Sequence, residues 1–204
     1  CLEDRACIYI FGGNAEAALD HLFQMMKISD ELQNPLLRCD ALFALGNAAF
    51  ILGDWHQAET YFDESLAIAL ELDNQARIPL NYLWLGELAL VNGQQPKAHD
   101  YFVRAIRQSY AERRLAVLLL GLEGMARTHI HDGSQDDALA TLYFIIKHPN
   151  TWEFARKRVK SFLADIECNL SSEELSRAVE TSRTMELDHI VYAWLSSISS
   201  HAPA

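Results

Sequence analysis

Residues 45–65 read LGNAAFILGDWHQAETYFDES, and residues 85–105 read LGELALVNGQQPKAHDYFVRA. The two stretches align without a gap at a shift of 40 residues, with a glycine, an alanine and a phenylalanine at matching points. Gly53 and Gly93 suit the left-handed residue that ends a helix. Asp54, directly after the first of them, suits the N-cap of the next helix. Each stretch therefore predicts two helices joined by a tight turn.

The same spacing runs through four copies of the sequence, in six columns that repeat every 40 residues. The glycine column is Gly13, Gly53, Gly93 and Gly133, and the alanine column is Ala18, Ala58, Ala98 and Ala138. The others are Leu22, Phe62, Phe102 and Leu142; Ala6, Gly46, Gly86 and Ala126; Leu2, Leu42, Tyr82 and Leu122; and Ile10, Phe50, Leu90 and Ile130. Small residues let paired helices approach closely, and the large residue four places on fills the gap. We therefore predict helical hairpins that stack around a continuous core.

These columns resemble the tetratricopeptide (TPR) pattern. The resemblance is carried by Leu45-Gly46, Gly53-Asp54-Trp55, Ala58, Phe62 and Ser65, and again by Leu85-Gly86, Gly93, Ala98, Tyr101-Phe102 and Ala105. It implies an all-α fold, a right-handed α-α superhelix of about four 40-residue helix pairs. The period exceeds the 34 residues of standard TPR repeats. Such long repeats, and the stretch AIALELDN at residues 67–74, are similar to the arrays of bacterial STAND-type ATPases and LuxR-type regulators.

The repeat weakens after Lys147, which divides the chain into residues 1–148 and residues 149–204. We expect the first part to hold four hairpins, and the second a degenerate fifth hairpin and a capping helix, because solenoids need atypical ends. Pro149 breaks the chain at the boundary. Two N-caps are predicted beyond it, namely Asn150 with Glu153 and Ser171 with Glu174.

The chain is acidic, with a formal net charge of −11 and a pI near 5.1. Such a charge disfavours contact with nucleic acid. The four cysteines, Cys1, Cys7, Cys39 and Cys168, show no metal or CxxC spacing, which favours reduced thiols in the cytoplasm. We find no signal peptide and expect no membrane-spanning run.

One local run is basic, at Arg156, Lys157, Arg158 and Lys160. We interpret it as a solvated helix face, because Glu153 is spaced to pair with Lys157. A phosphate-binding site is the alternative.

Motifs that carry catalysis are absent from the sequence, so we expect no enzyme activity and no cofactor. The best metal candidates are His129, His131 and Asp132. Residues two apart on a helix point in different directions, so packing is the favoured interpretation and no metal site is predicted. The repeated aromatics are interpreted as core rather than a base-stacking platform; they are Trp55, Tyr61, Phe62, Tyr101 and Phe102.

The TPR resemblance places the first helix of each pair along a concave groove that binds partners. The groove columns are Cys7, Asn47, Glu87 and Arg127; Glu3, Phe43, Leu83 and Glu123; and Phe11, Ile51, Val91 and His131. This surface suits a peptide or helix from a protein partner. The alternative is that the apolar members pack against neighbouring helices. With Arg127 as its one cation, the groove does not suit acidic C-termini.

The leading hypothesis is a protein-interaction or ligand-sensing module of a larger bacterial signalling or transcription-regulatory protein. Its partner is a protein, a peptide or another domain of the same chain. A free-standing scaffold that forms homo-oligomers through Trp194 and Ile198 is the second hypothesis. A metal-dependent enzyme built on His129, His131 and Asp132 is the third. Since the chain starts at Cys1 rather than at methionine, we expect it to be part of a longer protein.

Overall fold

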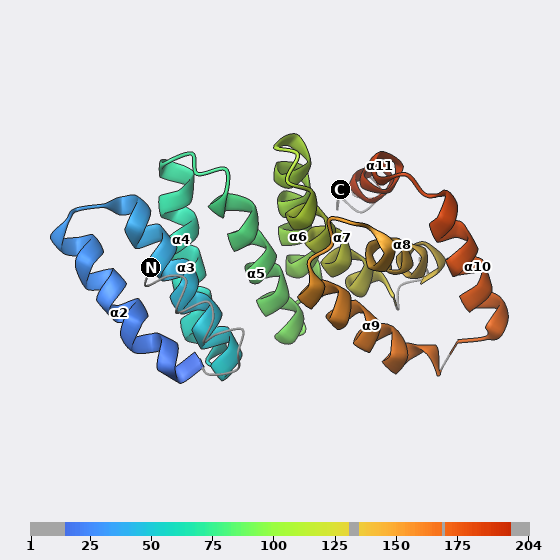
Figure 1. The fold of residues 1–204 in the computed structure, drawn as a ribbon, viewed down its shortest axis with the longest axis horizontal. Coiled ribbons are helices and arrows are strands. Elements are labelled where there is room, and N and C mark those ends of the chain that lie inside the picture. The colour runs from blue at the N-terminus through green and yellow to red at the C-terminus, as the bar shows by residue number, and fades with distance from the viewer. Residues whose placement is uncertain (1–14, 131–134, 169, 197–204) are drawn as a thin grey trace. The chain divides into compact units, whose positions relative to one another are not determined.

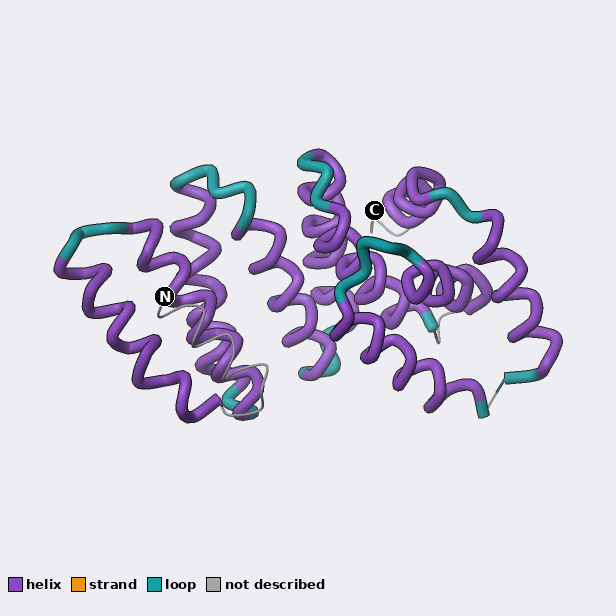
Figure 2. The backbone as a smooth tube through the Cα atoms, in the orientation of Figure 1, coloured by secondary structure: helices purple, strands orange, loops and turns teal. Residues whose placement is uncertain are grey.

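The computed structural model describes residues 15–130, 135–168 and 170–196, which hold ten α-helices and no strand (Figures 1 and 2). The helices are α2 (Ala15–Glu31), α3 (Pro35–Leu52), α4 (Trp55–Glu71), α5 (Arg77–Val91), α6 (Gln95–Ala111), α7 (Leu115–His129), α8 (Gln135–Lys147), α9 (Glu153–Glu167), α10 (Ser172–Thr184) and α11 (Leu187–Ser196). The expected all-helical fold of packed pairs is confirmed. The first glycine turn, at Gly13, and the fourth, at Gly133, lie outside the described residues.

The turns between helices keep the 40-residue period. Gly53 and Gly93 have φ angles of 80° and 70°, as predicted for residues that end a helix in the left-handed region. A second series at the same spacing was not predicted: Gln33, Asp73 and Arg113 have φ angles of 48°, 49° and 53°. These residues follow α2, α4 and α6, so both types of interhelical turn bend through one left-handed residue.

Residues 1–94 form one compact unit, whose described helices are α2 to α5. Ala58 and Phe62 of α4 are fully buried against α3. A Cβ atom added to Gly46 of α3 would lie 2.6 Å from the Phe62 ring, so the predicted close approach of this helix pair is present. The Phe62 ring also stacks on Trp84 of α5, with centroids 6.0 Å apart, and meets Phe43 edge-on at 5.8 Å.

Residues 95–204 form a second compact unit, with helices α6 to α11. The alanine column continues through it, since Ala98, Ala138 and Ala178 are all buried. Phe102 of α6 packs directly on Gly124 of α7, a close approach that the sequence columns did not predict. α10 lies along α8, and α11 contacts α6. The predicted division between residues 148 and 149 rests on repeat regularity and stays a prediction.

Two of the predicted helix caps are confirmed. The Asp54 side chain accepts a hydrogen bond from the Gln57 backbone N–H at 3.2 Å. Ser171 and Glu174 form a reciprocal capping box before α10, and the hydrogen bonds from Ser171 lower the pKa of Glu174. The predicted Asn150 cap is wrong, because α9 starts at Glu153 and its N-cap is Trp152, two residues further on, which makes no side-chain cap hydrogen bond.

Helix α3 departs from the expectation that no apolar run is long enough to span a membrane. Its 18 residues, Pro35–Leu52, are long and apolar enough to cross a membrane, judged by length and composition alone. In the folded protein, 56% of these residues are buried. The helix contacts α2, α4 and α5, so its apolar surface faces its own unit. A helix in a protein core can be as long and as apolar as a membrane-spanning helix, so one such helix is weak evidence for a membrane span.

Candidate functional site

Four of the predicted groove residues, on α3 and α5, are buried. Phe43 and Leu83 are buried, as are Asn47 and Glu87. The Arg77 guanidinium covers the Phe43 ring at 4.7 Å from its centroid. For Phe43 and Leu83, the structure therefore shows the packing role that was the alternative to partner binding.

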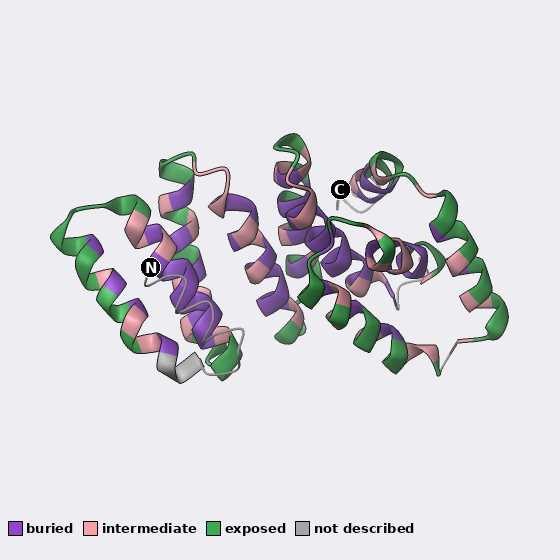
Figure 3. Ribbon diagram, viewed as in Figure 1, coloured by how far each residue is buried: buried purple, intermediate pink, exposed green. Residues whose placement is uncertain are grey.

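Two further predicted groove residues, Ile51 and Val91, are exposed to solvent. Their exposed fractions are 45% and 44%; Ile51 is the last residue but one of α3, and Val91 is the last residue of α5. Leu52 and Trp55, beside the α3–α4 turn, are equally exposed at 45% and 44%. Figure 3 colours the end of α5 and the α3–α4 turn as exposed. We call Ile51, Leu52, Trp55 and Val91 the turn-end patch. Trp55 was predicted to be core, and its position as the first residue of α4 instead leaves it at the surface.

A buried polar network fixes the helices that carry this patch. The Asn81 side-chain amide of α5 donates to Ser65 Oγ of α4 at 3.1 Å. The Ser65 hydroxyl in turn donates to the Cys39 carbonyl of α3 at 3.0 Å. Burial raises the pKa of the Cys39 thiol, which keeps the thiol protonated. The network links α3, α4 and α5. The sequence analysis named Ser65 and Cys39 separately and did not predict the hydrogen bonds that connect them.

The first unit is strongly acidic. Its described part, residues 15–94, contains twelve carboxylates and three cations. Each cation is already paired with a carboxylate: Lys27 with Glu31 at 3.8 Å, Arg38 with Asp30 at 2.6 Å, and Arg77 with Asp40 at 2.5 Å. Carboxylates thus outnumber cations in the described part of this unit.

In the second unit, the predicted groove residues Glu123 and Arg127 are held by α9. Glu123 is fully buried, and Arg158 of α9 donates to both of its carboxylate oxygens, at 2.7 and 2.6 Å. Arg127 lies 3.9 Å from the same carboxylate and stacks over the Phe162 ring. The ion pair holds α9 against α7, so Glu123 is a packing residue in this structure. His131 lies outside the described residues, as do Glu3, Cys7 and Phe11.

The predicted reading of the basic run needs correction. Glu153 pairs with Arg156 at 3.5 Å rather than with Lys157, and Arg158 points inward to Glu123. Lys157 and Lys160 are exposed, as expected for a solvated face.

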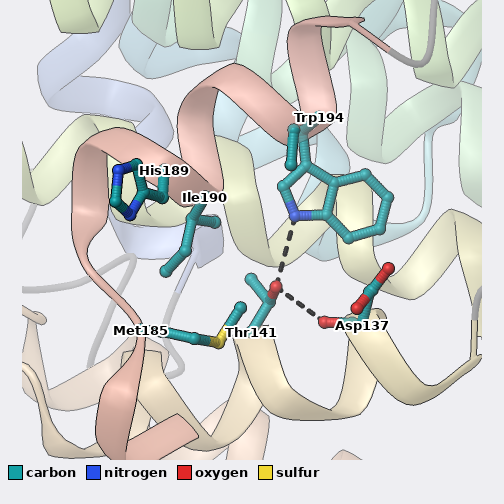
Figure 4. Close-up of a pocket in the computed structure, with 7 residues that line it drawn as sticks. Asp137, Thr141, Met185, His189, Ile190 and Trp194 are labelled. Carbon is teal, nitrogen blue, oxygen red and sulfur yellow. Dashed lines mark hydrogen bonds between the residues drawn. The ribbon is translucent and has the colours of Figure 1, made fainter. Parts of the chain in front are cut away.

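A pocket of about 260 Å³ lies between α8 and α11 (Figure 4). Its lining residues are Asp137, Thr141, Met185, His189, Ile190, Ala193 and Trp194. The Trp194 indole N–H donates to Thr141 Oγ1 at 3.2 Å, and Thr141 donates to the Asp137 carbonyl at 2.8 Å. Trp194 is buried within its own unit, which conflicts with the expectation that it faces a second copy. Ile198 lies outside the described residues.

Of the metal candidates, only His129 is described. Its ring lies between His99, at 5.3 Å, and Trp194, at 5.1 Å between centroids. Over the described part of the chain, no three metal-ligating side chains come together. The contacts of His129 agree with its interpretation as a packing residue.

Comparisons with known proteins agree with this architecture. A tetratricopeptide repeat family model matches residues 39–72, which span most of the α3–α4 hairpin. No curated protein matches the sequence. One similar solved structure is that of a Podosopora anserina protein assigned as a kinesin light chain, which is built of nearly identical TPR-like repeats. This chain superimposes on it with a TM-score of 0.59 at 17% sequence identity, and the match covers 98% of this chain and 93% of that one. A variant of that protein gives 0.58 at 17% identity, covering 98% and 95%. The chain thus has a TPR-like helical-repeat fold, a fold that typically binds protein partners.

Proposed function

We propose that the chain is a protein-interaction or ligand-sensing module of a larger bacterial signalling or transcription-regulatory protein. The observation that carries this proposal is the turn-end patch. Ile51 and Val91 occupy equivalent places in successive repeats, and both are exposed near the ends of α3 and α5. Exposed apolar surface of this kind marks interaction sites.

The rest of the unit supports the patch as a rigid platform. The Asn81–Ser65–Cys39 network and the Phe62–Trp84 stack fix α3, α4 and α5 against one another. A platform that is ordered before binding loses little conformational entropy when a partner docks. We propose that a peptide or helix lays its apolar side chains across the ends of α3 and α5.

The regulatory context rests on the sequence. The 40-residue period and residues 67–74 are similar to the arrays of bacterial STAND-type and LuxR-type regulators. In that setting the module works in the cytoplasm and passes a binding signal to an effector domain. Its acidic charge supports a protein partner rather than nucleic acid.

A self-associating scaffold is the second candidate, because the opposite end of the first unit also exposes leucines. These are Leu32, Leu36, Leu70 and Leu72, between 41% and 66% exposed. They lie where α2 and α4 end and α3 begins. Sedimentation at rising concentration tests this candidate, and a monomer throughout would exclude it.

Affinity capture from native cell extract tests the leading proposal. The parent chain is compared with Ile51→Ser/Val91→Ser, and with the control Leu70→Ser/Leu72→Ser, which removes two exposed aliphatic side chains from the opposite end. We expect a protein that the parent and the control retain and that the Ile51/Val91 variant loses, with helicity unchanged in all three. Equal retention by all three would move the site away from the turn-end patch. Capture of no protein by any of them would contradict binding to a separate partner.

A further inference from the structure

Helix α9, in the second unit, buries one narrow stripe and leaves another side exposed. Its buried side chains recur every four residues, at Ala155, Val159 and Leu163. Away from this stripe, Phe154 and Lys157 are exposed three residues apart, and Lys160 follows after three more. Residues at this spacing are neighbours on the surface of a helix. Figure 3 shows exposed residues where α9 begins.

A tryptophan just before the helix extends this exposed surface. The Trp152 and Phe154 rings lie 5.7 Å apart between centroids, and the two residues are 41% and 39% exposed. We call Trp152, Phe154, Lys157 and Lys160 the α9 face. Single apolar side chains are scattered over every protein surface, whereas grouped ones mark interaction sites. Tryptophan and phenylalanine are also enriched at protein interfaces, so this pair indicates a docking surface.

The loop that carries Trp152 is held in place by hydrogen bonds. The Thr151 hydroxyl donates to the Ile145 carbonyl at 2.6 Å. The Arg156 guanidinium donates to the carbonyls of His148 and Thr151, at 3.2 and 3.3 Å. The tryptophan is thus presented from an ordered backbone, and docking against it costs little conformational entropy in this loop.

The α9 face also carries positive charge. Residues 150–164 contain four cations and one carboxylate, Glu153. The two arginines of this run already pair with carboxylates. Among the described residues, neither Lys157 nor Lys160 belongs to an ion pair. The two lysine ammonium groups are therefore available to an incoming anion.

The unit that contains α9 does not repel anions as the first unit does. Residues 1–94 contain four cations and fourteen carboxylates, whereas residues 95–204 contain thirteen cations and fourteen carboxylates. Most of the net charge of −11 therefore belongs to the first unit. Close to α9, the local excess of cations sets the sign of the potential.

We propose that the α9 face binds an acidic segment of a protein partner. Apolar side chains of the segment cover Trp152 and Phe154, while its carboxylates approach Lys157 and Lys160. The inference goes beyond the proposed function, because it adds an interaction surface on the second unit and names the charge of what binds there. Charge complementarity of this kind accelerates association and excludes wrong partners.

The small number of lysines argues against other anionic occupants. Salt-sensitive binding to nucleic acid typically neutralises about 6–10 phosphates, and anionic membranes attract clusters of about 4–8 basic residues. The α9 face offers two exposed lysines beside two aromatic rings. A short peptide with a few carboxylates and a few apolar side chains matches this surface better.

Fluorescence anisotropy with defined peptides tests the proposal on the full chain. The probe is a labelled amphipathic helix of leucine and glutamate, and its counterpart carries lysine in place of glutamate. The charge variant is Lys157→Gln/Lys160→Gln. The matched control is Arg107→Gln/Arg183→Gln, which removes two exposed cations from α6 and α10 of the same unit.

We expect the glutamate peptide to bind and the lysine peptide not to bind. Two exposed charge pairs predict an affinity about 2- to 30-fold weaker for the Lys157/Lys160 variant, with the control unchanged. Binding of the glutamate peptide also weakens as salt rises.

A second pair of variants tests the aromatic rings. Trp152→Ala/Phe154→Ala weakens binding about 10- to 100-fold, because aromatic anchors dominate the energy of small interfaces. Trp152→Phe keeps a ring and retains most of the binding, which separates a lost contact from a misfolded loop. Far-ultraviolet circular dichroism checks that every variant keeps its helicity. Ile51→Ser/Val91→Ser leaves binding of the glutamate peptide unchanged, so this surface is tested independently of the turn-end patch.

Four results would overturn the proposal. Equal weakening in the Lys157/Lys160 variant and its control would show diffuse attraction to the cations of the unit. Equal binding of the lysine peptide would remove the charge argument, and no binding of the glutamate peptide would remove the docking surface. Tighter binding of single-stranded DNA or of phosphatidylserine vesicles, lost in the Lys157/Lys160 variant, would assign the α9 face to a different class of occupant.

Discussion

Replacing Gly46 by alanine tests the close packing of α3 on α4. The added Cβ would lie 2.6, 2.7 and 2.9 Å from three carbons of the Phe62 ring, whereas ordinary contact begins at 3.4 Å. The ring cannot retreat freely, because it is fully buried, stacked on Trp84 and in edge contact with Phe43. Overpacking of this kind costs about 1–3 kcal/mol. Alanine regains about 1 kcal/mol of helix propensity, so a clash at the upper end leaves a net loss of about 2 kcal/mol.

Urea unfolding followed by far-ultraviolet circular dichroism measures this loss. The double variant Gly46→Ala/Phe62→Leu provides the control, because a smaller side chain at position 62 relieves the clash. We expect the double variant to lose less stability than the sum of the two single variants. Stability losses of the two single variants that simply add in the double variant would refute the close approach of the two helices.

Three further predictions concern the second unit and one turn of the first. Arg158→Met leaves the carboxylate of Glu123 buried without its bidentate partner; because Arg158 is one-third exposed, we expect a loss of about 1–3 kcal/mol in chemical denaturation, which adding Glu123→Leu largely restores. Burial and the hydrogen bond to Glu167 raise the pKa of Tyr143 from 10.0 to about 12, so the folded chain keeps a proton that the unfolded chain loses. The contribution of Tyr143 to the free energy of unfolding is therefore fully present below pH 10 and is lost between pH 10 and about 12. The free energy of unfolding of Tyr143→Phe, measured over the same pH range, should fall less than that of the parent, and equal falls would contradict the raised pKa. Gln33→Gly should raise stability by about 0.5–1 kcal/mol because φ is positive there, while Gln33→Val lowers it; the opposite order in thermal unfolding would contradict the left-handed turn.

The helices and the core of the repeats follow from the sequence because their constraints are local and periodic. Ala58, Ala98, Ala138 and Ala178 are all buried at the spacing that the alanine column predicts. Small residues at fixed intervals report where helices touch, so the period alone places the contacts. Gly53 likewise predicts a turn, because glycine adopts positive φ without strain.

The left-handed turns at Gln33, Asp73 and Arg113 could not be predicted in this way. None of these residues is a glycine, so the sequence lacks the strongest local signal for positive φ. The Arg158–Glu123 pair was also missed, because it joins residues 35 positions apart where the 40-residue columns weaken. A buried charge finds its partner through three-dimensional packing, which the period does not encode.

The candidate site was predicted in part. The groove columns include Ile51 and Val91, whose exposure agrees with a binding role, together with Phe43 and Leu83, which are buried. Periodicity identifies the face of a helix, but it does not tell how far along that face the neighbouring helices cover it. Exposure near the turn therefore depends on where α3 and α5 end.

Site-specific photo-crosslinking in cells tests the central claim most directly. A photoreactive phenylalanine analogue is placed at Val91 in the turn-end patch and, in a separate protein, at Leu72 on the opposite end of the unit; both positions are half-exposed. The account predicts a defined protein partner crosslinked from position 91 and absent from position 72. The same products from both positions, or none from position 91, would contradict a binding site at the ends of α3 and α5.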